Sequence, residues 1–348
     1  MNTTANRIAC WLLASALWQV APAMQAQSAD DESMPWFQQD AGTNKYAVIV
    51  TGAAASADIA ERFRRWTRDL HSTLRDDYGY DGDNIRILID EGQPLDGLTV
   101  SASSRVDDIA DTLSTLQTEV DAGDQLSLFM IGHGSGTFGD AKFNNVGPDM
   151  TGADLASMLA GFTEQDIVII NTTSASFEFS RELSALGRVV VSATRSPSER
   201  YDPIFAGYMI AGLQDHTADL DRNGRVSILE LFNYASGRVA GWYDEQGRLA
   251  TENAVLDDTG DGLFSREPGA TQADGLLAEI AYVDVIVPEA EKTSPQARAL
   301  RVDMQGLERE IFILRNQKQN YLEDDYWRRL EALLIDLATR TRTYNALP

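Results

Sequence analysis

An apolar β run passes directly into a glycine-rich loop with a single histidine in the sequence LSLFMIGHGSG, residues 126–136. A second apolar run, at 167–170, leads into the polar loop Asn171-Thr172-Thr173-Ser174. Between such runs lie segments whose apolar residues recur at spacings of three and four, as on the buried face of a helix. This alternation predicts an α/β fold in which helices cover both faces of a mostly parallel sheet. Three further runs of the same kind lie at 46–50, 85–89 and 189–191.

The histidine and the polar loop follow two successive strands of this expected sheet. Sites in such sheets form beyond the carboxyl ends of the strands, so we expect His133 to lie close to Thr173 and Ser174. A histidine after one strand and a nucleophile after the next is the arrangement of a Cys–His dyad, in which the imidazole must reach the sulfur. The one cysteine of the chain, Cys10, lies far from both segments in the sequence.

These strands and loops resemble the caspase and legumain superfamily of cysteine peptidases over residues 45–265. The resemblance rests on the first strand, on the third strand leading into His133, and on the fourth strand leading into residues 171–174. It implies that His133 matches the catalytic histidine and that Thr173 stands in the place of the nucleophilic cysteine. Further departures in the same loop are Asn171 in place of an acidic residue and Ala175-Ser176 in place of Ser-Gly. The resemblance therefore implies a caspase-like fold without its nucleophile, a pseudopeptidase.

Two interpretations of the loop stay open. In the first, the hydroxyl groups of Thr173 and Ser174 satisfy backbone groups at the strand end, and the chain is a binding or scaffold module for an unknown protein or peptide. In the alternative, His133 activates a Ser or Thr nucleophile of an active peptidase or hydrolase. A hydroxyl has a far higher pKa than a thiol and needs a strong, oriented base. By the same resemblance, Arg195 after the fifth strand would line a substrate pocket.

A calcium loop is predicted by the sequence DLDRNGRVSILE at residues 219–230. Its spacing matches the twelve-residue loop of an EF-hand, with Gly224 at the sharp turn in position six. A second acidic loop, at 257–262, resembles half of this pattern and is expected to be a helper of the calcium site or a plain turn. The oxygen ligands for Ca²⁺ would come from Asp219, Asp221, Asn223, the backbone carbonyl of Arg225, Ser227 and Glu230.

The first 26 residues are typical of a secretory signal peptide. Arg7 supplies the positive charge, residues 8–20 the apolar stretch, and residues 21–26 the small residues of a cleavage site. Cys10 falls within this segment, so the exported protein, periplasmic or secreted, would carry no thiol and no disulfide. Residues 27–44 are polar and predict a flexible tether.

The charge and the remaining segments complete the expected organisation. Acidic residues outnumber basic ones 53 to 29, which disfavours nucleic acid and anionic membranes as partners. No later segment has the length of about 20 apolar residues that a membrane span needs. The α/β domain is expected over 45–290, with a last β run at 280–287. Two helical patterns over 291–348, with a bend at 320–325, predict a helical hairpin or coiled coil that offers a face for docking or homodimerisation.

Overall fold

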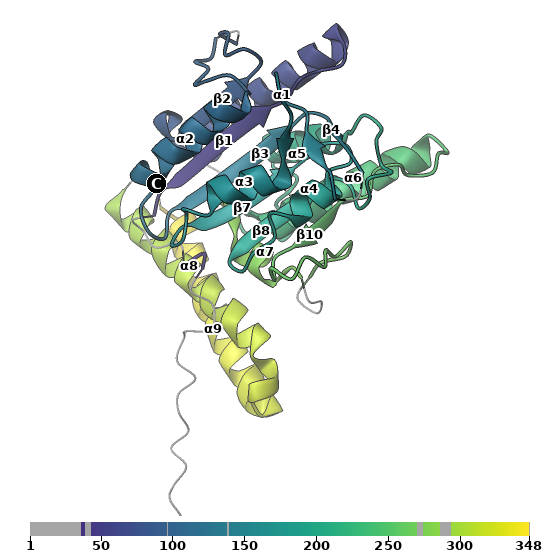
Figure 1. Cartoon of the computed structure of the whole chain (residues 1–348). Helices are drawn as coiled ribbons and strands as arrows, with labels where there is room; N and C mark the ends of the chain where they lie inside the picture. Colours follow the sequence, from purple (N-terminus) through teal and green to yellow (C-terminus); the bar gives the residue numbers. More distant parts are fainter. Residues whose placement is uncertain are drawn as a thin grey trace, which may run out of the picture. The chain divides into compact units, whose positions relative to one another are not determined.

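The computed structural model describes residues 36–38, 43–95, 97–137, 139–269, 274–285 and 294–347. The expected signal peptide, with Cys10, and most of the expected tether lie outside these residues. Among them, a sheet of six strands has the order β10-β8-β7-β3-β1-β2 (Figure 1). Five strands are parallel, and β10 pairs antiparallel with β8 at one edge. The strands are β1 Lys45–Thr51, β2 Ile85–Ile89, β3 Gln125–Ile131, β7 Asp166–Asn171, β8 Arg188–Ser192 and β10 Val255–Asp257.

Helices cover both faces of this sheet, as expected from the alternating pattern (Figure 1). The helices on or beside the sheet are α1 Ala57–Asp76, α2 Val106–Glu119, α3 Gly152–Leu159, α4 Phe177–Arg181, α5 Phe205–Gln214, α6 Ile228–Glu245 and α7 Leu276–Ile280. The C-terminal helices are α8 Pro295–Asn316 and α9 Glu323–Asn345, and the 3-10 turns are Gly82–Asn84 and Lys318–Asn320. The short strands are β4 Gly134–Ser135, β5 Lys142–Phe143, β6 Met150–Thr151, β9 Arg225–Ser227 and β11 Tyr282–Val285.

The core between α2, α3, α4 and the sheet is apolar and almost completely excluded from solvent. Val48 and Leu128 of the central strands pack there with Leu113 of α2 and Leu155 of α3. On the opposite face, α1 packs against β1, β3 and α5. Each fully buried side chain of this size stabilises the fold by about 1.5–3 kcal/mol. Burial on both faces explains why the strands read as continuous apolar runs.

The starts of α3 and α6 are fixed by side-chain caps that follow local sequence signals. Thr151 caps α3: its hydroxyl accepts from the Asp154 N–H, and the Asp154 carboxylate accepts from the Thr151 N–H. Ser227 and Glu230 form the same reciprocal pair at the start of α6. Such boxes satisfy backbone donors that would otherwise lack partners. The cap at Ser227 also fixes how the loop 219–230 enters the helix.

Three segments differ from the sequence-based expectation. Residues 36–38 are not a free tether, because Phe37 is buried and its carbonyl accepts from Arg309 Nη1 at 2.7 Å. The last strand begins at Tyr282 rather than 280, because the Asp258 carboxylate accepts from the N–H groups of Gly275 and Ala278 and starts α7 there. The bend between the C-terminal helices lies at 317–322, since α9 already begins at Glu323.

We predict that Glu252 makes the stability of the fold depend on pH. Its buried carboxylate accepts from the N–H groups of Ile204 and Phe205 at 2.9 and 3.0 Å. Burial raises the pKa of Glu252 to about 7 from its ordinary 4.5, against the effect of those two hydrogen bonds. The raised pKa in the folded state means that stability is full below pH 4.5 and is lost as the pH rises through 7.

The expected result is a fall in the free energy of unfolding of about 1 kcal/mol between pH 6 and 7.5. Urea unfolding at several pH values measures it. Glu252→Gln should flatten this slope, whatever it does to the absolute stability. The matched control, Glu245→Gln at an exposed position, should leave the slope unchanged. If the free energy of unfolding depended on pH equally in Glu252→Gln and in the unmodified chain, Glu252 would not be the group responsible.

Candidate functional site

The loops after β3 and β7 meet at the carboxyl edge of the sheet, as their sequence predicts. The two strands pair in parallel, with Met130 opposite Asn171. The Ser174 hydroxyl lies between the loops, because it accepts from the Gly134 N–H at 3.3 Å and donates to the Gly134 carbonyl at 3.2 Å. A Cβ at Gly134 would lie 2.2 Å from the Ser174 carbonyl oxygen. Only glycine allows this close approach of the two backbones.

Thr173, at the position of the expected nucleophile, is buried and already hydrogen-bonded. The residue is only 1% exposed. Its hydroxyl donates to Asn171 Oδ1 at 2.7 Å, and its N–H donates to the same oxygen at 3.1 Å. The hydroxyl proton is therefore directed to the Asn171 amide and away from the imidazole. This arrangement ties down the end of β7, as Asn and Thr side chains commonly do at turns.

His133 lies beside this loop without reaching its hydroxyl groups. In the part of the chain that the structure describes, no hydrogen bond joins its ring to a Ser or Thr side chain of residues 173–176. Its ring packs against Phe63 at a centroid distance of 5.3 Å, and Nε2 lies 4.0 Å from Asp202 Oδ1. Burial lowers the pKa of His133, Arg62 lowers it further, and Asp202 opposes them. The imidazole is therefore held in its neutral form at neutral pH.

The rest of the polar loop is also committed to structure. Ser176 Oγ lies 2.8 Å from Ser192 Oγ and 3.0 Å from Thr194 Oγ1, in a buried hydroxyl cluster. Ala175 has a φ of 49°, a region that side chains with a Cβ rarely adopt, and its N–H donates to the Glu199 carbonyl. The Ser176 hydroxyl is therefore bonded within this cluster rather than to His133.

A groove of about 410 Å³ opens at the same edge of the sheet. Its walls include His133, Asn144, Asp149, Arg200 and the turn at 53–55. Arg200 Nε donates to the Pro197 carbonyl at 3.2 Å. Among the described residues, the two terminal nitrogens of Arg200 have no hydrogen-bond partner. The groove therefore combines a neutral imidazole with a guanidinium that can donate paired hydrogen bonds to a carboxylate.

The structure places Arg195, the expected pocket residue, outside this groove. Its side chain is exposed and its Nε lies 3.5 Å from Glu199 Oε1, an ion pair between residues four apart. Sequence reasoning missed Arg200, and it also missed Asp202 and Arg62 beside the imidazole. Arg200 and Asp202 lie in irregular segments, where no periodic pattern indicates the direction of a side chain.

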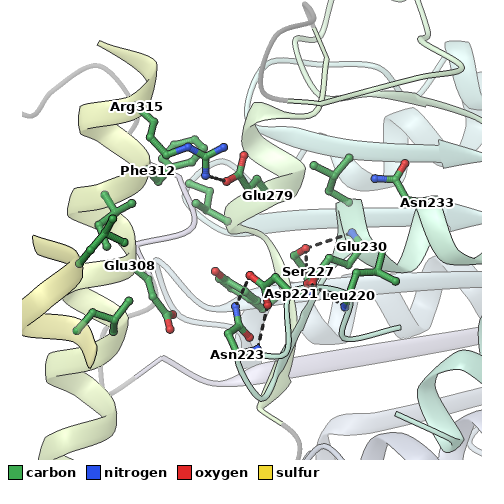
Figure 2. A pocket seen from close by; sticks show the side chains of 16 residues that line it. Leu220, Asp221, Asn223, Ser227, Glu230, Asn233, Glu279, Glu308, Phe312 and Arg315 are labelled. Atoms are coloured by element: carbon green, nitrogen blue, oxygen red, sulfur yellow. Dashed lines mark hydrogen bonds and ion pairs between the residues drawn. The ribbon is translucent and has the colours of Figure 1, made fainter. Parts of the chain in front are cut away.

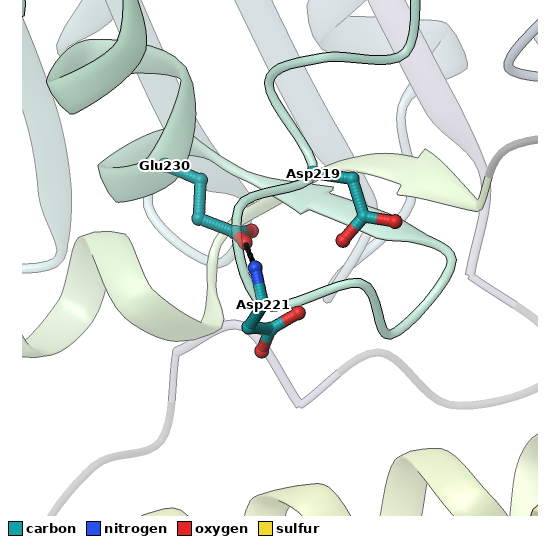
Figure 3. A group of neighbouring side chains, drawn as sticks. All are labelled: Asp219, Asp221 and Glu230. Carbon is teal, nitrogen blue, oxygen red and sulfur yellow. Dashed lines mark hydrogen bonds between the residues drawn. The ribbon is translucent and has the colours of Figure 1, made fainter.

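The loop 219–230 curls so that several of its oxygens converge (Figure 3). Asp219 accepts from the N–H groups of Asn223 and Gly224, both at 3.0 Å. Gly224 has a φ of 81°, the left-handed conformation that the turn at position six requires. Carboxylate oxygens of Asp219, Asp221 and Glu230 all lie within 4.8 Å of one another. This spread suits a Ca²⁺ ion, which binds oxygens at about 2.3–2.6 Å.

The same carboxylates repel one another in the absence of a cation. Burial, followed by the nearby Glu230 carboxylate, raises the pKa of Asp221 to about 6. The Glu230 carboxylate accepts from the N–H groups of Leu220 and Asp221 at 3.0 and 3.1 Å. Asn223 Oδ1 accepts from the Arg225 N–H at 2.8 Å, and Ser227 donates to Glu230 at 2.9 Å. The predicted ligands thus come together in space, held by the backbone of their own loop.

This loop lies at the amino end of the sheet, opposite the groove. Its strand β9 pairs with β11, in which Ser227 is the partner of Tyr282. The Tyr282 carbonyl accepts from Lys45 Nζ at 2.7 Å and from Gln125 Nε2 at 3.0 Å, and these are the first residues of β1 and β3. A seven-residue strand separates the two ends by roughly 20 Å. A cation in the loop would therefore act on structure rather than on chemistry at His133.

Arg225 connects the same loop to α8. Its guanidinium bonds to Glu308 at 3.0 Å and stacks 3.4 Å from the centre of the Tyr282 ring. Figure 2 shows Glu308 reaching from α8 across a cavity of about 550 Å³ toward Asp221 and Asn223. The hydrogen bond between Arg225 and Glu308 therefore joins two segments that lie more than eighty residues apart in the chain.

The second acidic loop, 257–262, forms its hydrogen bonds with segments other than the loop 219–230. Asp257 accepts from the N–H groups of Thr259 and Gly260, and also from the Ser184 hydroxyl. Its carboxylate is therefore used by local backbone donors. Of the two expectations for this loop, these contacts favour the plain turn.

No protein-family model matches the chain, and no curated protein is significantly similar to it. Within the described ranges, no helix combines the length and the apolar character that crossing a membrane requires.

We predict that Thr173→Val destabilises the fold by about 1–3 kcal/mol, because it removes the buried hydrogen bond that the Thr173 hydroxyl donates to Asn171 Oδ1. Thr173→Ser, which keeps the donor, should recover a large part of this loss. The matched control is Thr115→Val on the exposed side of α2, expected to cost less than about 0.5 kcal/mol. Chemical denaturation measures all three variants. A Thr173→Val variant as stable as the control would show that the hydroxyl has no structural role.

Proposed function

We propose that this chain is an exported, caspase- and legumain-like pseudopeptidase that acts as a calcium-stabilised binding or scaffold module, periplasmic or secreted. The observation that carries the proposal is the state of Thr173. Where the resemblance calls for an exposed thiolate, the chain has a buried hydroxyl that donates its proton to Asn171. A nucleophile needs an open path to its substrate and a base that receives its proton.

The geometry is unfavourable to the alternative, a Ser- or Thr-dependent hydrolase. Ser174 donates its proton to the Gly134 carbonyl, and Ser176 belongs to the buried hydroxyl cluster. His133 Nε2 is buried, and none of the described residues forms a hydrogen bond with it. Activation of either serine would require the loop between β7 and α4 to change its conformation and break these contacts.

The groove beside His133 supports recognition of a polypeptide. It is open, it is lined by the turn at 53–55, and it presents Arg200 together with the neutral imidazole. A guanidinium with two uncommitted nitrogens binds a carboxylate through paired hydrogen bonds. We therefore propose that the ligand is an extended peptide segment that carries an acidic side chain.

A panel of short synthetic peptides tests this proposal. Peptides that contain Asp or Glu should bind, and Arg200→Ala should weaken the affinity at least about tenfold. The matched control, Arg195→Ala, removes the exposed arginine outside the groove and should change nothing. The chain should not cleave peptides containing Asn, Asp or Arg, and a fluorophosphonate should not label it. Cleavage that disappears in His133→Ala would refute the pseudopeptidase proposal.

We further propose that Ca²⁺ binds the loop 219–230 and stabilises the domain. Support comes from the three carboxylates that converge there and from a spacing that matches an EF-hand loop. A ligand that binds only the folded state raises its stability in proportion to the logarithm of the ligand concentration. The loop lies far from the groove, so this effect is expected to be structural.

Calcium titration followed by thermal unfolding measures this effect. The Tm should rise with added Ca²⁺ and fall in chelator, and Mg²⁺ should replace Ca²⁺ poorly because it prefers a smaller octahedral site. Asp219→Asn and Glu230→Gln should abolish the response. Asp215→Asn, an exposed change just before the loop, serves as the control and should keep it. A Tm that is the same in Ca²⁺ and in chelator would exclude the site.

A further inference from the structure

One wall of the groove beside His133 lies on the face of the sheet that α2 and α3 cover. It includes Asn145 and Asp149, from the connection between β5 and β6. Asn145 Nδ2 donates to the Ser104 carbonyl just before α2 at 2.6 Å, and α3 begins three residues after Asp149. Asp149 is exposed, and none of the described residues forms a hydrogen bond or an ion pair with its side chain.

The other wall lies on the face of the sheet that α1 and α5 cover. It includes Arg200, which lies two residues before Asp202. Asp202 forms an ion pair with Arg62 of α1, and α5 begins at Phe205. Arg200 is exposed, and among the described residues no ion pair joins it to Asp149. The groove thus separates two opposite charges that come from opposite faces of the sheet.

The other charged side chains that flank the two walls are paired. At the start of α2, Arg105 forms an ion pair with Glu91 at 2.9 Å. On the opposite wall, Asp202 is neutralised by its arginine partner in α1. The groove is therefore negative at the wall with Asp149 and positive at the wall with Arg200.

An extended peptide that lies between these walls presents successive side chains to opposite sides. When one side chain meets Arg200, the next one along the peptide meets Asp149. A carboxylate suits the guanidinium, and a cationic side chain suits the carboxylate. The formal net charge of the whole chain, −24, acts in the same direction. It repels a purely acidic peptide, and a basic residue in the peptide reduces this repulsion.

We propose that the groove selects a peptide in which an acidic residue and a basic residue are directly adjacent, and that Asp149 determines the preference for the basic one. This inference rests on the proposed binding of peptides at Arg200 and names their chemical class more closely. Exposed ion pairs are weak, so the basic residue should raise the affinity by about two- to fivefold.

Fluorescence anisotropy of labelled synthetic peptides with blocked ends, at about 0.15 M salt, tests this preference. The tighter of the two orders, Asp-Lys or Lys-Asp, should bind about two- to fivefold more strongly than the corresponding peptide with serine in place of lysine. A peptide in which one serine separates Asp from Lys should show little of this gain, because both charges then point to the same wall.

Variants of Asp149 identify the residue responsible. Asp149→Asn should remove the preference for lysine. Asp149→Lys should reverse it, so that a peptide with Asp-Glu binds more tightly than one with Asp-Lys. The matched control, Asp121→Lys, makes the same change of charge at an exposed position before β3, at the amino end of the sheet. This control should keep the preference for lysine, and circular dichroism verifies that each variant is folded.

The outcomes separate this inference from the proposed function. If the lysine and serine peptides bind equally, and Arg200→Ala weakens both, the inference is overturned while peptide binding at Arg200 stands. A preference for lysine that survives in Asp149→Asn also overturns the inference. If no peptide with an acidic residue binds, the inference and the proposed function both fail.

Discussion

The central position of β3 is the constraint on which both candidate sites depend. Its carboxyl end leads into His133 and the groove, and Gln125 at its amino end holds the Tyr282 carbonyl of β11. Because β11 pairs with β9, the same strand also fixes the loop 219–230. Parallel pairing with β1 and β7 leaves β3 buried on both faces and unable to shift its register without exposing its apolar side chains. Two sites at opposite edges therefore share one rigid support.

The sequence predicted the parts of this arrangement that local pattern determines. Apolar runs identified the strands, and the shared edge of parallel strands placed His133 near residues 173–174. The loop 219–230 could be proposed from the sequence because all the ligands predicted for Ca²⁺ lie within twelve consecutive residues. The direction of side chains in irregular segments was not predictable in this way. Arg195 turned to Glu199, four residues on, whereas Arg200 faces the groove, and nothing in the spacing of the two arginines distinguishes them.

Isolated contacts between distant segments were also beyond sequence reasoning. Phe37 lies in a polar stretch that read as a tether, yet it is buried and bonded to α8 through Arg309. The start of β11 depends on Asp258, which caps α7 from a loop seventeen residues earlier. Such contacts follow from packing of the folded chain and leave no periodic signal in the sequence.

Arg225 belongs to two structures at once, since its backbone lies in the loop 219–230 and its side chain holds Glu308 of α8. The guanidinium also occupies the face of Tyr282, in the strand that joins the loop to the sheet. A distortion of the loop 219–230 would therefore move Arg225 together with Glu308 and Tyr282. We therefore expect α8, α9 and the loop 219–230 to open together. Their backbone amides should then show similar protection from hydrogen exchange.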